Sequence, residues 1–535
     1  MKNYFNFQVV DKLNSISPAL GVLILLTFLN NIFDLGSINK NTIYYFVTSV
    51  LIITTLNIEK FTKNIEVLNL SVLIFIFADV LTRKLKIGEV MYLGRSLKSD
   101  AEFSSYIGDS HLVLFNYLVR LINNLNLDIK MSLNIISCFW LLIIILKSKE
   151  IFGFDNRDTL LLLLLLLNFQ TFFAAEFFFS SIEGKIFAYL SLFTSLLYAL
   201  EKKINPAFFY YSLSIFLHAS VAIVSFPVLI FILIKNFKIY KILRVGFYYF
   251  ILCLPFLIYI LQSNLFTFYS KDYTKELLEY LISFRLPHHL YPFDVGSNNL
   301  FNINTEWIPG FIFMLGITIL YIINLKFSKS KLSIENNLNL LVLQSLAVFW
   351  LYVSICKIFP ISKFVIAYPF RITTSILFLT YIFIILKHNN YSFRYKSFLQ
   401  NSLLVFLVIL TINNSNIGIN NKVEYIPQSM ELENKLIELE PEILFLPNYD
   451  IESKNSYLNS IEFRTGIPTY AAYRFNVFFI TNIEEWRKRI NMLQAFYGGD
   501  CDIFDEFKEY YYLDIKNNND CGNLVYDFEN FYIYK

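Results

Sequence analysis

Long apolar runs, bounded by short polar stretches, recur over the first three quarters of the chain. A helix needs about 20 mostly apolar residues to cross the hydrocarbon core of a bilayer. The runs predict about thirteen spans, near residues 17–35, 42–58, 66–82, 132–148, 158–178, 183–200, 205–217, 219–235, 243–262, 307–325, 335–356, 367–387 and 397–413. The two short runs flanking His218 could instead form one broken helix. We therefore expect a polytopic α-helical membrane protein.

Residues 112–125 are an exception among the apolar runs. The stretch HLVLFNYLVRLINNL is apolar on one helical face and carries Arg120. An amphipathic helix of this kind is typical of the membrane interface, where it lies along the surface without crossing. We predict that this segment does not span the bilayer.

Lysine and arginine collect in short loops between the predicted spans. Such loops face the cytoplasm in most membrane proteins, and the basic loops here include Lys60/Lys63, Lys147/Lys149/Arg157, Lys202/Lys203, Lys235/Lys238/Lys241/Arg244, Lys326/Lys329/Lys331 and Lys387/Arg394/Lys396. With thirteen spans, all of them fall on one side. The N-terminus is then cytoplasmic, and residues 83–131, 263–306 and 415–535 lie outside. In a bacterium this describes an inner (plasma) membrane protein with a periplasmic C-terminal domain.

The tail from residue 415 loses the long apolar runs and alternates helix and strand signals. Helical spacing covers residues 427–439 and 482–496 and continues over 505–511. EILFLP predicts a buried strand, residues 464–475 an extended segment, and LDIKN, NLVYDF and FYIYK closing strands. The chain thus divides into a transmembrane domain, residues 1–414, and a small α/β domain, residues 415–535.

Five cysteines are present. Cys138, Cys253 and Cys356 lie in or at the end of predicted spans, where a thiol is most simply a packing group. Cys501 and Cys521 both lie in the tail. An oxidising compartment would permit a disulfide between them, and two free thiols are equally compatible with the sequence.

Composition narrows the classes of function. The chain is 56% hydrophobic and 16% charged, and its net charge of +3 gives no reason to expect nucleic acid as a partner. It contains no P-loop, no G-x-G-x-x-G, no H-E-x-x-H and no cysteine zinc pattern. Membrane lipid is an expected partner, and the sequence does not identify any protein partner. The remaining candidates are polar residues on the predicted outer face.

Two outer loops carry candidate chemistry. In residues 83–131, Glu89 and Asp109 are carboxylates that could act as a general base or hold a divalent cation, Mg or Mn. In residues 263–306, FRLPHHLYP sets Arg285, His288 and His289 between two prolines, which suits phosphate binding. The alternatives are an ordinary solvated loop and an interfacial loop with incidental histidines.

Four further residues lie at the predicted outer ends of spans: Glu183 and Lys185 in SSIEGKIFAYL, His218, and Arg371 in AYPFRITT. Charged groups at membrane depth are costly and point to function. The simpler readings are a Glu183–Lys185 ion pair at a helix start and a hydrogen-bonded packing role for His218. All of these candidates converge on one face of the membrane, which favours a binding or active site there.

The order of these segments resembles the GT-C superfamily, polytopic glycosyltransferases with an acidic first outer loop and often a periplasmic C-terminal domain. The segments are GEVMYLGRSL with Asp109, SSIEGKIFAYLSL followed by His218, FRLPHHLYP, YPFRITTSILFL, and RTGIPTYAAYRF with IEEWRKRI. More specifically, the chain looks like an uncharacterised bacterial membrane family, prominent in cyanobacteria, of GT-C-like architecture.

The resemblance implies transfer of a sugar from a polyprenyl-phosphate-linked donor to an acceptor at the outer face. The catalytic base would be Glu89 or Asp109, although no acidic pair of the usual kind follows the preceding span. Arg285, His288, His289 and Arg371 would hold the donor phosphate. A transporter or flippase of a lipid-linked saccharide, and a polysaccharide polymerase or ligase, remain alternatives.

Overall fold

The computed structural model describes residues 113–168, 183–262, 293, 307–327, 333–358, 369–390, 404, 407, 428–446, 461, 465, 467, 469–470, 480–504, 510–514, 521–528 and 531–535. The predicted spans near 17–35, 42–58 and 66–82 lie outside these ranges. The predicted span 397–413 is represented by Leu404 and Leu407 alone.

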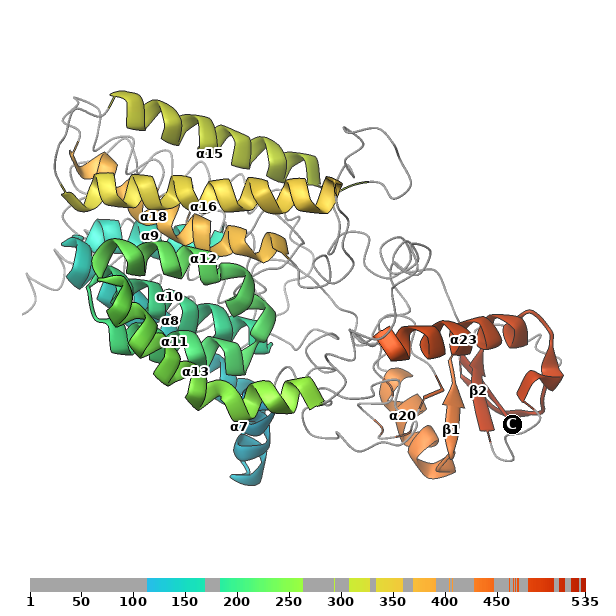
Figure 1. Ribbon diagram of the computed structural model, residues 1–535. Coiled ribbons are helices and arrows are strands. Elements are labelled where there is room, and N and C mark those ends of the chain that lie inside the picture. Colours follow the sequence, from blue (N-terminus) through green and yellow to red (C-terminus); the bar gives the residue numbers. More distant parts are fainter. Residues whose placement is uncertain are drawn as a thin grey trace, which may run out of the picture.

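A helix lies at each predicted span from 132–148 to 367–387, within the described ranges (Figure 1). The helices here are α7 (Val113–Asn124), α8 (Ile129–Phe152), α9 (Asn156–Asn168), α10 (Gly184–Leu200), α11 (Ile204–Leu217), α12 (Ala219–Asn236), α13 (Ile239–Gln262), α15 (Ile308–Phe327), α16 (Ser333–Ile358), the 3₁₀ turn η5 (Pro369–Arg371) and α18 (Ile372–Asn390). Both ends of α8 are capped. Asp128 is the N-cap and accepts a hydrogen bond from the Met131 amide at 2.6 Å, and Gly153 is the C-cap with a left-handed backbone (φ +68°).

Several of these helices have the length and apolarity of membrane spans. Among the described residues, Ile129–Phe152, Ala219–Asn236, Asn337–Ile358 and Pro369–Lys387 are long and apolar enough to cross a bilayer. Gly184–Leu200, Ile204–Leu217 and Gly310–Leu325 are shorter apolar helices. The protein is therefore a mostly helical integral membrane protein.

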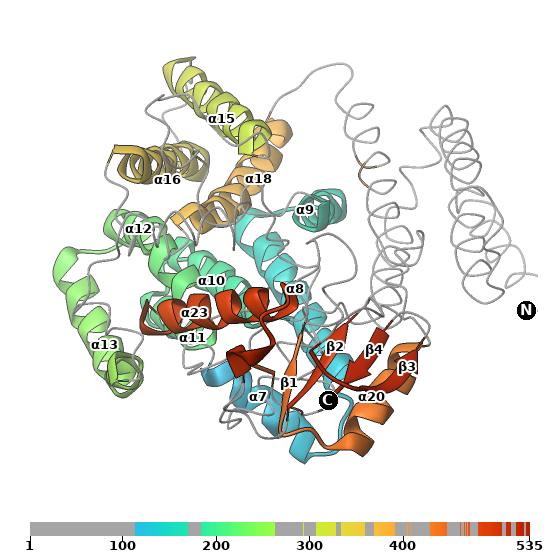
Figure 2. The ribbon, with the colours of Figure 1, turned by 90° about the vertical axis from the view of Figure 1, so that its right-hand side faces the viewer.

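Helices α10 and α18 form the centre of the helical domain. Figure 2 shows α10 among α8, α11 and α12, and contacts join it to each of them. Of the apolar window in α18, 89% is buried, compared with 39% in α8. Phe193 and Phe378 stack at 4.2 Å between ring centroids and join α10 to α18. Large apolar side chains are exposed on α8, α13 and α15, as expected of surfaces that face lipid.

The chain turns back at His218, so α11 and α12 are two helices and the single broken helix is excluded. His218 has an extended backbone (φ −164°, ψ 96°) between them. The Tyr211 hydroxyl donates to the Ala222 carbonyl across the hairpin at 3.1 Å. Small hydroxyls tie α11 to α10 in an antiparallel ladder, with Ser191 on the Tyr210 carbonyl, Ser195 on Ala207 and Ser214 on Ala188.

Helix α7 confirms the predicted amphipathic segment. Phe115, Val119 and Ile122, spaced four and three residues apart, are buried, whereas Tyr117 and Leu121 are exposed. Its placement along the membrane surface stays a prediction.

The C-terminal residues form a four-stranded sheet in the order β1-β2-β4-β3. The strands are β1 (Ile443–Phe445), β2 (Tyr510–Asp514), β3 (Leu524–Phe528) and β4 (Phe531–Tyr534), with α20 (Gln428–Leu439), α23 (Ile480–Tyr497) and the 3₁₀ turn η6 (Cys501–Phe504). Strands β1 and β2 are parallel, and the other two pairs are antiparallel.

Successive side chains of a strand point to opposite faces of the sheet, and each face of this sheet has its own hydrophobic core. Leu444 and Leu513 pack with Leu436 of α20, whereas Phe445 packs on the other face with Phe496 of α23. A small α/β arrangement of one helix on each face is thus confirmed for this part of the chain.

Most tail predictions hold, with three differences. Helix α23 begins at Ile480, two residues before the predicted start. The predicted helix over 505–511 is wrong at its end, because Tyr510 and Tyr511 begin β2 and alternate ring positions across the sheet. In the segment predicted to be extended, Thr469 pairs in parallel with Leu444, but Thr465 is helical.

The cysteine alternatives are also decided. Cys501 and Cys521 form a disulfide, with Cα atoms 5.0 Å apart. The thiols of Cys138, Cys253 and Cys356 are not in disulfides and are buried in their helices, as expected of packing groups.

Candidate functional site

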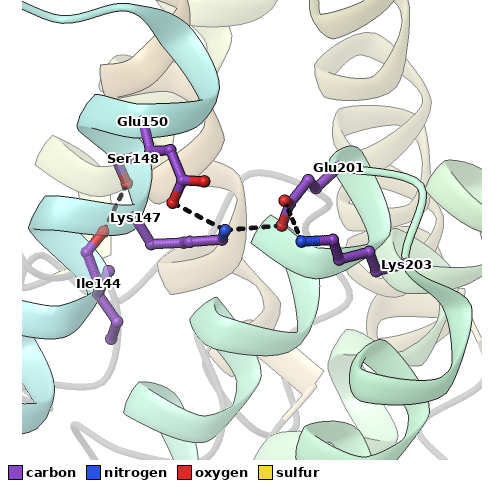
Figure 3. Close-up of polar contacts among 6 residues, drawn as sticks. All are labelled: Ile144, Lys147, Ser148, Glu150, Glu201 and Lys203. Carbon is purple, nitrogen blue, oxygen red and sulfur yellow. Dashed lines mark hydrogen bonds and ion pairs between the residues drawn. The ribbon is translucent and has the colours of Figure 1, made fainter.

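One end of the helical domain is held together by a charged cluster, which Figure 3 shows. Glu201, just after α10, lies between Lys147 of α8 and Lys203; the Lys147 Nζ–Glu201 Oε2 distance is 2.9 Å. The Asn236 side chain at the end of α12 donates to the Ala199 carbonyl at 2.9 Å. The final turns of α8, α10 and α12 therefore meet at this end, in agreement with the prediction that their basic loops share one side.

Glu201 is the electrostatic centre of this cluster. Burial by itself would raise the pKa of its carboxyl, but hydrogen bonds from Lys203 and Lys147 outweigh burial and hold the pKa below its usual value. Glu150 adds a second carboxylate to Lys147 at 2.9 Å. Every charge here has a partner, so the cluster joins three helix ends and is a structural group.

At the opposite end, three polar side chains form a connected group: His218, Ser220 and Arg371, here called the HSR cluster. Arg371 Nη1 donates a hydrogen bond to the Ser220 hydroxyl. Ser220 Oγ lies 3.1 Å from His218 Nδ1. The cluster joins the start of α12 to the start of α18, two helices that run parallel, as the Ser375–Ser225 hydrogen bond at 3.0 Å one turn further along confirms.

The local sequence explains why Arg371 is held there. Pro369 begins the η5 turn, and Phe370 packs edge-to-face on Trp307 (5.3 Å) and Phe349 (6.3 Å). These contacts fix the turn from two sides. The Arg371 side chain then lies at the helix start with only 8% of the residue exposed.

Glu183 and Lys185 form a second polar pair at the same end. Their side chains make an ion pair at 2.8 Å, and each is 14% exposed. The Ser214–Ala188 hydrogen bond connects this region to α11. Helices α10 and α11 are antiparallel, and a helix rises about 1.5 Å per residue. Lys185 comes three residues before Ala188, and His218 comes four residues after Ser214. Along the helix axes, the two residues therefore lie about 4.5 and 6 Å from that hydrogen bond, both toward the same end of the domain.

A third group at this end comes from the predicted second outer loop. Phe293, four positions after His289 in the sequence, is buried and lies 6.2 Å from the Phe311 ring of α15. Lys357, near the end of α16, places its Nζ 5.0 Å from the centroid of Phe293. The end of α16 also reaches α12, where the Tyr352 hydroxyl donates to the Val224 carbonyl.

Of the residues singled out from the sequence, the structure brings His218 and Arg371 into one cluster. It pairs Glu183 with Lys185 separately, at the same end. Glu89, Asp109, Arg285, His288 and His289 lie outside the described residues. Sequence reasoning missed Ser220, because a serine in the first turn of a helix is common and nothing in the sequence marks it as a partner of His218 or Arg371.

In the described ranges, no group of three or more His, Cys, Asp or Glu side chains is arranged to hold a metal ion. The divalent cation that Glu89 or Asp109 could hold stays a prediction. The chemistry that the HSR cluster offers is hydrogen-bond donation beside a buried positive charge, which suits an anionic oxygen.

Comparison with known proteins adds little. No family model matches the chain, and no curated protein matches it significantly. Among solved structures, the chain is similar to the crystal structure of ArnT from Cupriavidus metallidurans in the apo state, at 10% sequence identity over 88% of this chain and 98% of that chain, with a TM-score of 0.40. A TM-score this low carries no argument about the site.

Proposed function

We propose that the protein is a membrane glycosyltransferase that takes a sugar from a polyprenyl-phosphate-linked donor. The observation that supports this most directly is the HSR cluster. It sets a buried guanidinium beside a histidine and a serine at the helix ends next to the predicted outer loops. A membrane-embedded cation at that depth is costly and is typical of recognition of a charged substrate group.

The chemistry of sugar transfer fits these residues. The donor loses a lipid phosphate, so negative charge builds on that phosphate as the bond to the sugar breaks. Arg371 stabilises the charge through a fixed guanidinium, and His218 adds a hydrogen-bond donor. The acceptor hydroxyl needs one base, a role that we assign to Glu89 or Asp109, whose carboxylates belong to the predicted first outer loop.

The remaining candidates are given supporting roles in this proposal. Arg285, His288 and His289 add contacts to the phosphate, and Phe293 anchors the loop that carries them against α15. The Glu183–Lys185 pair, at the same end of the helical domain, orients the sugar or its acceptor. The lipid chain lies against the apolar helix surfaces, and the C-terminal domain binds acceptor on the outer side.

The test is sugar transfer by the purified chain in lipid nanodiscs, with polyprenyl-phosphate sugars as donors. Arg371→Met should raise the donor KM or abolish transfer. Arg371→Lys should retain only part of the transfer activity, because lysine lacks the planar fork of hydrogen-bond donors that arginine has. Lys203→Met, at the opposite end, is the matched control and should retain transfer. Transport of a lipid-linked saccharide without transfer would favour the flippase instead, and use of a pyrophosphate-linked oligosaccharide would favour a polymerase or ligase.

A further inference from the structure

The Ser220 hydroxyl lies between two nitrogen groups of different character. Its partners in the described part of the chain are Arg371 Nη1 and His218 Nδ1. A guanidinium nitrogen can only donate, so Ser220 Oγ accepts from Arg371. The hydroxyl keeps one proton of its own, and the acceptor within reach is the His218 ring nitrogen at 3.1 Å.

We infer that Ser220 is a positioning residue that fixes the tautomer of His218. The relay runs from the Arg371 N–H to Ser220 Oγ and from the Ser220 O–H to His218 Nδ1. With Nδ1 accepting, the imidazole is neutral and carries its proton on Nε2. A neutral ring with its proton on Nδ1 would leave the Ser220 O–H without an acceptor among the contacts described for it. An imidazolium donating from Nδ1 would in addition put a second positive charge one hydroxyl away from the Arg371 guanidinium, where like charges repel.

The backbone holds the relay in place. His218 lies between α11 and α12 with an extended backbone, so the turn, and neither helix, sets the direction of its side chain. Ser220 lies in the first turn of α12, and Arg371 is buried at the start of α18. The relay therefore spans three fixed points on different elements.

The tautomer gives His218 a defined part in sugar transfer, and this part rests on the proposed function. The Nδ1 lone pair is occupied by Ser220 and Nε2 carries a proton, so His218 is not arranged as a general base. The Nε2–H of this tautomer is a hydrogen-bond donor, as the guanidinium of Arg371 is. The base of the reaction is then a carboxylate.

The direct test is nitrogen NMR of the full chain with ¹⁵N-labelled histidine, in nanodiscs at pH 7. The chain has five histidines, so His218→Gln identifies the signals of His218 by their loss. We expect a protonated Nε2 and an unprotonated Nδ1. Ser220→Ala should leave the ring exchanging between tautomers, and Ser220→Thr, which keeps the hydroxyl, should restore the original spectrum.

A control on the same two helices separates the relay from general packing. The double variant Ser225→Ala, Ser375→Ala removes the other hydroxyl contact between α12 and α18 and leaves no buried partner unsatisfied. It should leave the His218 spectrum unchanged. In transfer assays, Ser220→Ala should raise the donor KM about tenfold, the lower end of the effect of a hydrogen bond to a charged group, with a smaller change in kcat.

Each outcome decides one question. A protonated Nδ1 in the unmodified chain, or an unchanged spectrum in Ser220→Ala, overturns the relay whatever the activity. If the spectra are as expected but no polyprenyl-phosphate sugar supports transfer, the relay stands and the proposed function is wrong. An equal change in the control double variant would show that helix packing, not Ser220, sets the tautomer.

Discussion

Removal of the Cys501–Cys521 disulfide should loosen the C-terminal domain by a predictable amount. The two cysteines lie 20 positions apart in the chain. Closing a loop of that length stabilises the folded state by about 3 kcal/mol in the chain-entropy model. Cys501 begins η6 directly after α23, and Cys521 precedes β3. The bridge therefore ties the end of a core helix to the hairpin that closes the sheet.

The assay follows urea-dependent proteolysis of the tail in the full chain, detected by a tag after Lys535. For a small domain, urea lowers the free energy of unfolding by about 1–3 kcal/mol per molar, so Cys501→Ser with Cys521→Ser should lower the midpoint by about 1–3 M. Cys253→Ala, which changes a thiol buried in α13, is the matched control and should leave that midpoint unchanged.

Two results would overturn the predicted role of the Cys501–Cys521 disulfide. An unchanged midpoint in the double variant would mean that the loop gains nothing from the bridge. Mass spectrometry of alkylated, non-reduced protein from native membranes is the second check, and two free thiols there would contradict the disulfide. That result would also count against an oxidising, extracytoplasmic location of the tail.

Three further predictions follow from particular contacts. Because the pKa of Glu201 is lowered on folding, its contribution to stability is present above its ordinary value of 4.5 and is lost as pH falls through the lowered value. Glu201→Gln should lower thermal stability near pH 7 by about 1 kcal/mol and flatten its fall in acid, measured by thermal unfolding in detergent. Gly522→Ala would place a Cβ 2.8 Å from the Lys535 carbonyl oxygen and should cost the C-terminal domain about 1–3 kcal/mol in the urea assay, whereas Gly316→Ala in α15 meets open space and should not. A reporter fused after Lys535 should be active outside the cytoplasm and one near Lys238 inside; the reverse would overturn the orientation.

The helices were predictable because few backbone conformations are stable in lipid. A segment in lipid has no water to bond, so its backbone N–H and C=O groups must form hydrogen bonds with one another, as they do in a helix. The length of the apolar runs therefore located α8, α12, α16 and α18 to within a few residues. The turn at His218 was left open by hydropathy, since two short helices and one broken helix have the same composition. The extended backbone of His218 and the hydrogen bond from Tyr211 to the Ala222 carbonyl decide it, and neither can be read from hydropathy.

The site was predictable only in part. Arg371 and His218 stood out because charged and titratable groups at membrane depth are rare. Their connection through Ser220 could not be inferred, because a serine near a helix start is common and the two partners are about 150 positions apart in sequence. The end of the predicted helix 505–511 failed for a related reason: the alternation of Tyr510, Tyr511 and Tyr512 across the sheet depends on pairing with β1.

In the proposed function, the HSR cluster binds the phosphate of a lipid-linked sugar donor. The most direct measurement is the affinity of the purified chain in nanodiscs for a polyprenyl-phosphate sugar, compared with the same polyprenol lacking the phosphate. We expect tighter binding of the phosphorylated lipid, with that preference lost in Arg371→Met and kept in Lys203→Met. Equal affinity for both lipids, or a preference that survives Arg371→Met, would contradict it.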